Sequence, residues 1–164
     1  MRLRSFVFCF FVANAAWLPA QELFKKNHLV DIELEADEHF EGYAFKAALE
    51  QYLELQALDS TSQTKEIDFK IGVCYLETYG YQDALYYLQR ASSAVGETPT
   101  SFAYYLAKAY QLNGLVEEAI IAYNDYLLQI TGNEDLVKYT QEVEREIQNC
   151  ETAKGFYAAP VDVH

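Results

Sequence analysis

The residues best suited to bind a metal or exchange protons lie between positions 31 and 41. Six carboxylates and one imidazole fall in this segment: Asp31, Glu33, Glu35, Asp37, Glu38, His39 and Glu41. Such groups are common ligands of divalent cations. On a helix, however, they spread around the axis, and Ala36 stands three residues before His39, where a di-iron Glu-x-x-His pair needs glutamate. We therefore interpret the segment as a solvated acidic face, with His39 as a packing residue and no metal.

Nucleophilic and redox catalysis have equally few candidates. The sequence contains no G-x-S-x-G, H-E-x-x-H, P-loop, G-x-G-x-x-G or C-x-x-C motif. Its three histidines, His28, His39 and His164, supply few general bases. We therefore predict that the protein is not an enzyme and has no catalytic residue and no cofactor.

A repeat of about 35 residues sets the positions of these side chains. Three alanines lie 36 and 35 residues apart, each three residues after an apolar side chain: Phe45 and Ala48, Tyr81 and Ala84, Val116 and Ala119. A second small residue lies upstream of each, three residues before a ring: Ala36 and His39, Gly72 and Tyr75, Ala107 and Tyr110. Steps of three and four residues are the period of a helix. Each unit therefore predicts two antiparallel helices that approach closely at the small residues.

Helix-breaking residues separate the units and predict an all-α chain. The breaks are Asp59–Ser62, Gly96–Pro99 and Thr131–Asn133. One hairpin cannot bury its apolar face, whereas three stacked hairpins can, so we predict an α-solenoid. The expected parts are repeats over 21–133 (hairpins at about 28–60, 62–95 and 99–131), an amphipathic capping helix over 134–156, and the start of a linker or strand over 157–164.

The first twenty residues predict a secretory signal peptide. Arg2 and Arg4 precede an apolar run from Phe6 to Leu18, and Ala20 supplies a small residue at the cleavage site. The run is shorter than the roughly 20 residues that span a bilayer. We therefore expect export, removal of residues 1–20, and no transmembrane span afterwards. Of the remaining cysteines, Cys74 and Cys150 are separated by several helices of a stack, so we predict two buried free thiols.

The net charge excludes several classes of partner. Lys and Arg number 12 against 25 Asp and Glu, a net of -13, which repels nucleic acid and anionic membranes. Loss of residues 1–20 removes two arginines and no acid, which leaves -15. Residues 31–59 hold nine acids and one lysine, so more than half of this charge lies in the first unit.

The second and third units resemble the tetratricopeptide repeat over roughly residues 30 to 131. The matching positions are Ile71, Gly72, Tyr75, Tyr81, Ala84 and Ala91, then Leu106, Ala107, Tyr110, Gly114, Ala119 and Tyr123. The first unit departs, with Ala36 and His39 where Gly and Tyr are usual. Together with the signal peptide, residues 147–154 and residues 159–163, the repeats are similar to the N-terminal region of Gram-negative envelope proteins. Those proteins carry a β-propeller and an OmpA-like peptidoglycan-binding domain, and some serve outer-membrane assembly, or type IX secretion and gliding.

The resemblance implies a partner-binding groove lined by the first helix of each pair. The implied residues are Val30, Glu33, Asp37, Phe40 and Glu41, then Glu66, Phe69, Val73, Leu76 and Glu77, then Ser101, Tyr104, Lys108, Gln111 and Leu112. Their acids and rings suit a basic and apolar peptide, or a helix of a partner protein. The same residues also fit plain packing and solubility.

Two functions follow from this resemblance. One is a non-catalytic scaffold in the periplasm or at the outer membrane, which holds another envelope protein. The other is a structural spacer that self-associates or docks on a C-terminal domain outside this chain. The sequence leaves the oligomeric state open.

Overall fold

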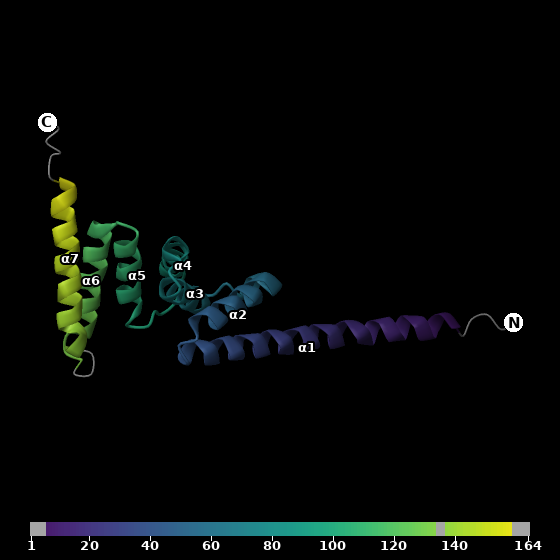
Figure 1. Cartoon of the computed structure of the whole chain (residues 1–164). Helices are drawn as coiled ribbons and strands as arrows, with labels where there is room; N and C mark the ends of the chain where they lie inside the picture. The colour runs from purple at the N-terminus through teal and green to yellow at the C-terminus, as the bar shows by residue number, and fades with distance from the viewer. Residues whose placement is uncertain (1–5, 134–136, 159–164) are drawn as a thin grey trace, which may run out of the picture. The chain divides into compact units, whose positions relative to one another are not determined.

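The computed structural model describes residues 6–133 and 137–158, with side chains from 21 to 133 and from 138 to 155. The described residues form seven α-helices and two short 3-10 helices, without a β-strand among them, so the all-α prediction is confirmed (Figure 1). The elements are α1 (Phe6–Glu41), α2 (Phe45–Leu58), η1 (Ser60–Ser62), α3 (Lys65–Glu77), α4 (Tyr81–Ser93), α5 (Phe102–Leu112), α6 (Val116–Ile130), η2 (Val137–Tyr139) and α7 (Thr140–Ala158).

The chain forms two compact units that divide between Ser60 and Thr61. From here on, "first unit" and "second unit" mean these two parts of the structure and not the sequence repeats. The first contains the pair α1–α2, and the second contains α3–α4, α5–α6 and α7. Helix α1 runs from Phe6 to Glu41, so the first helix of the expected hairpin is the C-terminal part of a longer one. Cleavage after residue 20 stays a prediction. Residues 157 and 158 belong to α7, and the rest of the expected linker or strand lies outside the described residues.

The same type of turn connects the two helices of each of the three pairs. Tyr43, Tyr79 and Gly114 have φ angles of 60°, 66° and 76°, in the left-handed region. These positions are 36 and 35 residues apart, which is the spacing of the repeat. In each turn the next backbone N–H donates to a carbonyl five residues earlier, at 2.8 Å, 2.8 Å and 2.9 Å. This is a Schellman cap, which ends one helix and directs the chain back along it.

The small residues of the repeat mark close contacts between helices, as predicted. Gly72 of α3 and Ala84 of α4 are buried, and so are Ala107 of α5 and Ala119 of α6. At Gly72 the fit is tightest, because a Cβ atom there would lie 2.6 Å from Cγ of Leu88 and 3.3 Å from its backbone nitrogen. Leu88 is itself fully buried, so it has little room to move.

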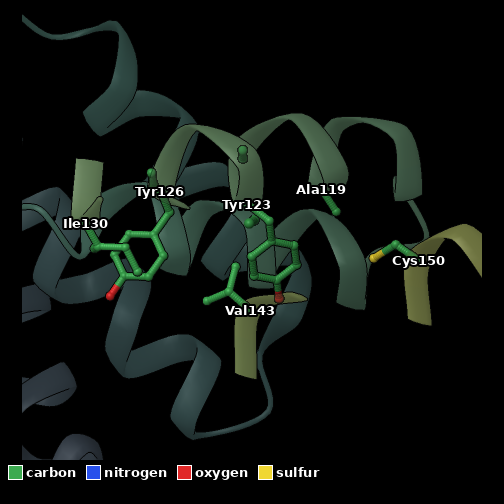
Figure 2. Packing of buried hydrophobic residues seen from close by; sticks show 9 residues of the cluster. Ala119, Tyr123, Tyr126, Ile130, Val143 and Cys150 are labelled. Carbon is green, nitrogen blue, oxygen red and sulfur yellow. The ribbon is translucent and has the colours of Figure 1, made fainter. Parts of the chain in front are cut away.

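Helix α7 covers the apolar face that α6 leaves open. Figure 2 shows Tyr123, Tyr126 and Ile130 of α6 beside Val143 of α7, with Cys150 farther along the same helix. These side chains form one buried cluster with Ala103, Ala107, Ala119 and Ala122, and Ile147 packs against it. The apolar residues of the amphipathic pattern thus lie on α6. The capping helix, predicted over 134–156, begins as an α-helix at Thr140 after η2, and residues 134–136 lie outside the described residues.

The two described cysteines are free and buried, as predicted. Cys74 lies on α3 and Cys150 on α7. Burial raises the pKa of the Cys74 thiol to about 12, and it also raises the pKa of Cys150. Both thiols are therefore protonated at neutral pH, and they act as packing groups instead of nucleophiles.

Replacing Gly72 with alanine should destabilise the second unit. The added methyl collides with Leu88, and such overpacking costs about 1–3 kcal/mol of unfolding free energy. Gly155→Ala on α7 is the matched control, because nothing lies within 4 Å of its Cβ position and alanine gains about 0.5–1 kcal/mol in a helix. Urea unfolding followed by circular dichroism measures both. Equal midpoints for the two variants would contradict the close contact.

The Cys74 thiol should make stability fall between pH 9 and pH 11. In this window the unfolded thiol ionises while the folded one stays protonated, so protons leave the unfolded state first. One such group contributes at most about 1.4 kcal/mol per pH unit. Urea unfolding of Cys74→Ala, compared with the parent chain, should show a shallower decline with pH. The control is the same comparison at pH 6–8, where the difference between the two chains should be constant; parallel curves above pH 9 would refute the assignment.

Candidate peptide-binding face

Exposed and half-buried side chains of α3, α5 and α7 share one surface of the second unit, which we call the inner face. It comprises Glu66 and Glu77 of α3, Tyr104, Lys108, Gln111 and Leu112 of α5, and Glu142 and Glu146 of α7. Helical spacing relates the members on each helix. An ion pair and hydrogen bonds between side chains relate one helix to another.

An ion pair joins α3 to α5 on this surface. Nζ of Lys108 lies 3.2 Å from Oε1 of Glu77, and both side chains are about one-third exposed. A pair this accessible contributes at most about 1 kcal/mol. Its significance is geometric, because it shows that two residues predicted from separate repeats lie side by side.

A hydrogen-bonded chain joins α5 to α6 and α7. The hydroxyl of Tyr123 donates to Oε1 of Gln111 at 2.6 Å, and Nε2 of Gln111 donates to Oε2 of Glu146 at 2.8 Å. The same carboxylate oxygen accepts from Asn149 at 3.3 Å. Gln111 is therefore held from both sides. The sequence prediction missed Glu146 and Glu142, although their four-residue spacing beside the apolar stripe of α7 indicates a shared face.

Three of the predicted groove residues on α3 are buried. Val73 is 1% exposed and Leu76 is 3% exposed, so both serve the core. Phe69 is 8% exposed and packs against Phe102 and Tyr105 of α5, with ring centroids 5.7 Å and 5.8 Å apart. Aromatic side chains of α5 thus cover Phe69, so its ring is not available on the surface. Whether the exposed residues bind a partner stays a prediction.

A tyrosine-lined hollow of about 330 Å³ opens on the inner face. It is lined by Ser101, Tyr104 and Tyr105 of the α5 region, Tyr126 of α6, Tyr139 of η2 and Glu142 of α7. The hydroxyl of Tyr104 donates to Oε1 of Glu142 at 3.3 Å. Burial raises the pKa of Tyr104, and the negative charge of Glu142 raises it further. The hollow therefore combines tyrosine rings with one carboxylate.

A second hollow, of about 300 Å³, lies where α3 begins. Its lining residues are Lys65, Glu66, Phe69, Lys70, Glu97, Thr98 and Pro99. The ammonium of Lys65 donates to the carbonyls of Ala94 at 3.1 Å and Gly96 at 2.8 Å, and so holds the loop after α4. Lys70 pairs with Glu66 at 2.8 Å. Because Lys65, Lys70 and Glu66 all have partners within the chain, this hollow favours a charged ligand less than the tyrosine-lined one does.

A buried ion pair fastens α4 to α3 behind the inner face. The carboxylate of Asp68, 2% exposed, accepts from Nε of Arg90 at 2.5 Å and also from its Nη2. The guanidinium carbon lies 4.6 Å from the ring centre of Tyr87 and 5.6 Å from that of Tyr86. The hydrogen bond to Asp68 raises the pKa of Arg90. This pair is structural, because removing one partner would leave a buried charge.

In the first unit, the predicted residues on α1 divide into engaged and exposed ones. Asp37 accepts a hydrogen bond from Tyr52 of α2 at 2.5 Å, and Phe40 packs edge-on against Phe45 and Tyr52. Val30, Glu33 and Glu41 are exposed.

The acidic cluster of α1 also contacts α2. His39 bonds to Gln51 at 2.7 Å, and Gln51 donates to Glu35 at 3.0 Å, so the imidazole serves packing, as predicted. Within the part of the chain that the structure describes, no three His, Cys, Asp or Glu side chains are arranged to hold a metal ion. The described helices also include none with the length and hydropathy needed to cross a membrane.

Comparisons with known proteins place the fold. No protein-family model matches the chain, and no curated protein matches it in sequence. Among solved structures, it is similar to the Yersinia enterocolitica type III secretion translocator chaperone SycD. That match has a TM-score of 0.62 and 14% identity, and it covers 79% of this chain and 88% of SycD.

SycD in complex with a peptide of the translocator YopD gives a second match. It has a TM-score of 0.60 and 14% identity, over 78% of this chain and 95% of that one. At this identity the likeness concerns the fold. The chain thus has the architecture of an α-solenoid of tetratricopeptide-like hairpins.

Proposed function

We propose that the protein is a non-catalytic scaffold of the cell envelope that binds a segment of another protein on its inner face. The observation that carries this proposal is the set of three side-chain contacts that align α3, α5 and α7: Lys108 with Glu77, Tyr104 with Glu142, and Gln111 with Glu146. They make one surface from helices far apart in sequence. A surface of this kind suits an extended or helical segment that touches several repeats.

The chemistry of the inner face indicates the class of segment. Tyr104 and Leu112 supply apolar area, and the inner face also carries four glutamates and one lysine. The lysine is already paired with Glu77. We therefore infer that the segment carries basic and apolar residues. The similarity to SycD, which has been solved with a translocator peptide, supports a peptide ligand on this type of fold.

The location in the envelope rests on the sequence. The basic and apolar residues before Ala20 fit an export signal, and the repeats followed by an amphipathic helix resemble envelope proteins of Gram-negative bacteria. We propose that the exported chain takes part in outer-membrane assembly or in secretion. Fractionation of cells that produce the full chain tests this, with N-terminal sequencing to locate the cleavage site. A chain that keeps residue 1 and stays in the cytoplasm would contradict it.

Peptides selected from an unbiased library on the full chain should be rich in basic and apolar residues. The variant that replaces Glu66, Glu77 and Glu142 with Gln should weaken the best peptide about tenfold at low salt and flatten its salt dependence. The matched control replaces Glu118, Glu144 and Glu151, which are exposed elsewhere and carry the same total charge. Binding is measured by calorimetry at two salt concentrations.

The outcomes separate the scaffold from the spacer. Equal losses in the two triple variants would refute binding at the inner face. If the library yields no binder and light scattering shows association that grows with concentration, the spacer is the correct function.

A further inference from the structure

We propose that the tyrosine-lined hollow holds one basic side chain, lysine or arginine, of the bound segment. This inference rests on the proposed function and names the chemistry of one position of its ligand. The hollow is formed by Tyr104 and Tyr105 of α5, Tyr126 of α6, Tyr139 of η2 and Glu142 of α7, with Ser101 beside them.

The tyrosine rings around the hollow are tilted against one another. Tyr104 is the hub, with ring centroids 5.5 Å from Tyr105, 5.5 Å from Tyr126 and 6.0 Å from Tyr123. The corresponding interplanar angles are 78°, 53° and 62°, so the rings are not stacked in parallel. The face of an aromatic ring is its negative region and attracts a cation within about 6 Å.

The carboxylate of Glu142 completes the charge of the hollow. It accepts one hydrogen bond from Tyr104, whereas a carboxylate has about four acceptor positions. Its side chain is exposed, so it can reach an incoming ammonium or guanidinium. An apolar side chain would instead cover this carboxylate without pairing it, at a cost in desolvation. The volume, about 330 Å³, is at the small end for ligand pockets and suits a side chain more than a cofactor.

The chain already holds a cation in this way at another place. Arg90 is bound between the carboxylate of Asp68 and the rings of Tyr86 and Tyr87, with 4.6 Å from its guanidinium carbon to the nearer ring centre. The same types of group line the hollow. The ammonium of Lys138 lies 5.0 Å from the ring centre of Tyr139, so one of the tyrosines that line the hollow already attracts a cation.

Butylguanidinium and butylurea test the hollow without a peptide partner. The first copies the arginine side chain, and the second has nearly the same shape without the charge. Each is titrated into the full chain carrying ¹³C-labelled tyrosine rings and followed by NMR. We expect butylguanidinium to bind about tenfold more tightly and to shift the signals of Tyr104 and Tyr126.

Three single variants with known charge changes sharpen the test. Glu142→Gln should weaken the binding of butylguanidinium about fivefold, and Glu144→Gln on the same helix should leave this affinity unchanged. Lys138→Gln should tighten it about twofold, because it removes a competing cation. Equal binding of butylurea, or equal losses in the two glutamate variants, would overturn the proposal.

A peptide experiment separates this inference from the proposed function. Each basic residue of a library-selected peptide is replaced by citrulline or by a neutral lysine isostere. A loss of about tenfold at one position supports the inference. If peptides bind the inner face but no replacement weakens them, the inference fails and the proposed function stands. If butylguanidinium binds but the library yields no peptide, the hollow accepts a basic group, and the proposed function fails together with the role of the hollow in it.

Discussion

A left-handed residue at the end of the first helix of each pair is the constraint on which the other contacts depend. Tyr43, Tyr79 and Gly114 adopt this conformation at intervals of 36 and 35 residues. A backbone of this type costs a tyrosine about 1 kcal/mol and costs glycine almost nothing. The Schellman hydrogen bonds in the two tyrosine turns are as short as the one at Gly114, so packing of the helices maintains the strained turns.

The turn fixes which faces of a pair meet, and the small residues then set how closely. With Gly72 against Leu88, the backbone of α3 lies directly on a side chain of α4. Larger residues are displaced to the two flanks, where Asp68 pairs with Arg90 on one side of α3 and Glu77 pairs with Lys108 on another. The inner face is thus a consequence of close packing behind it. A larger side chain at Gly72 would therefore shift the helices that carry both ion pairs, although Gly72 belongs to neither pair.

The periodicity of the sequence predicts the fold well and the site only in part. Spacing alone locates the small residues and the apolar stripe of α7, because both depend on local helical geometry. It misassigns Val73 and Leu76 to an open surface, since α3 packs against both α4 and α5 and has a narrower exposed stripe than a helix with one neighbour. It also misses the hollow, which needs side chains from four elements. No local pattern connects Tyr104 to Glu142, 38 residues away.

The charge of the chain has two different physical roles. The acids of the first unit suggest electrostatic steering when only the sequence is known, yet Asp37 and Glu35 are hydrogen-bonded to side chains of α2. Some of the acceptor positions of these carboxylates are therefore already occupied by hydrogen bonds within the chain. On α7, by contrast, Glu142 is exposed and lies beside tyrosine faces. A cation gains more where a carboxylate and aromatic rings act together than at a lone solvated acid. The second unit is therefore the better place to bind a basic side chain.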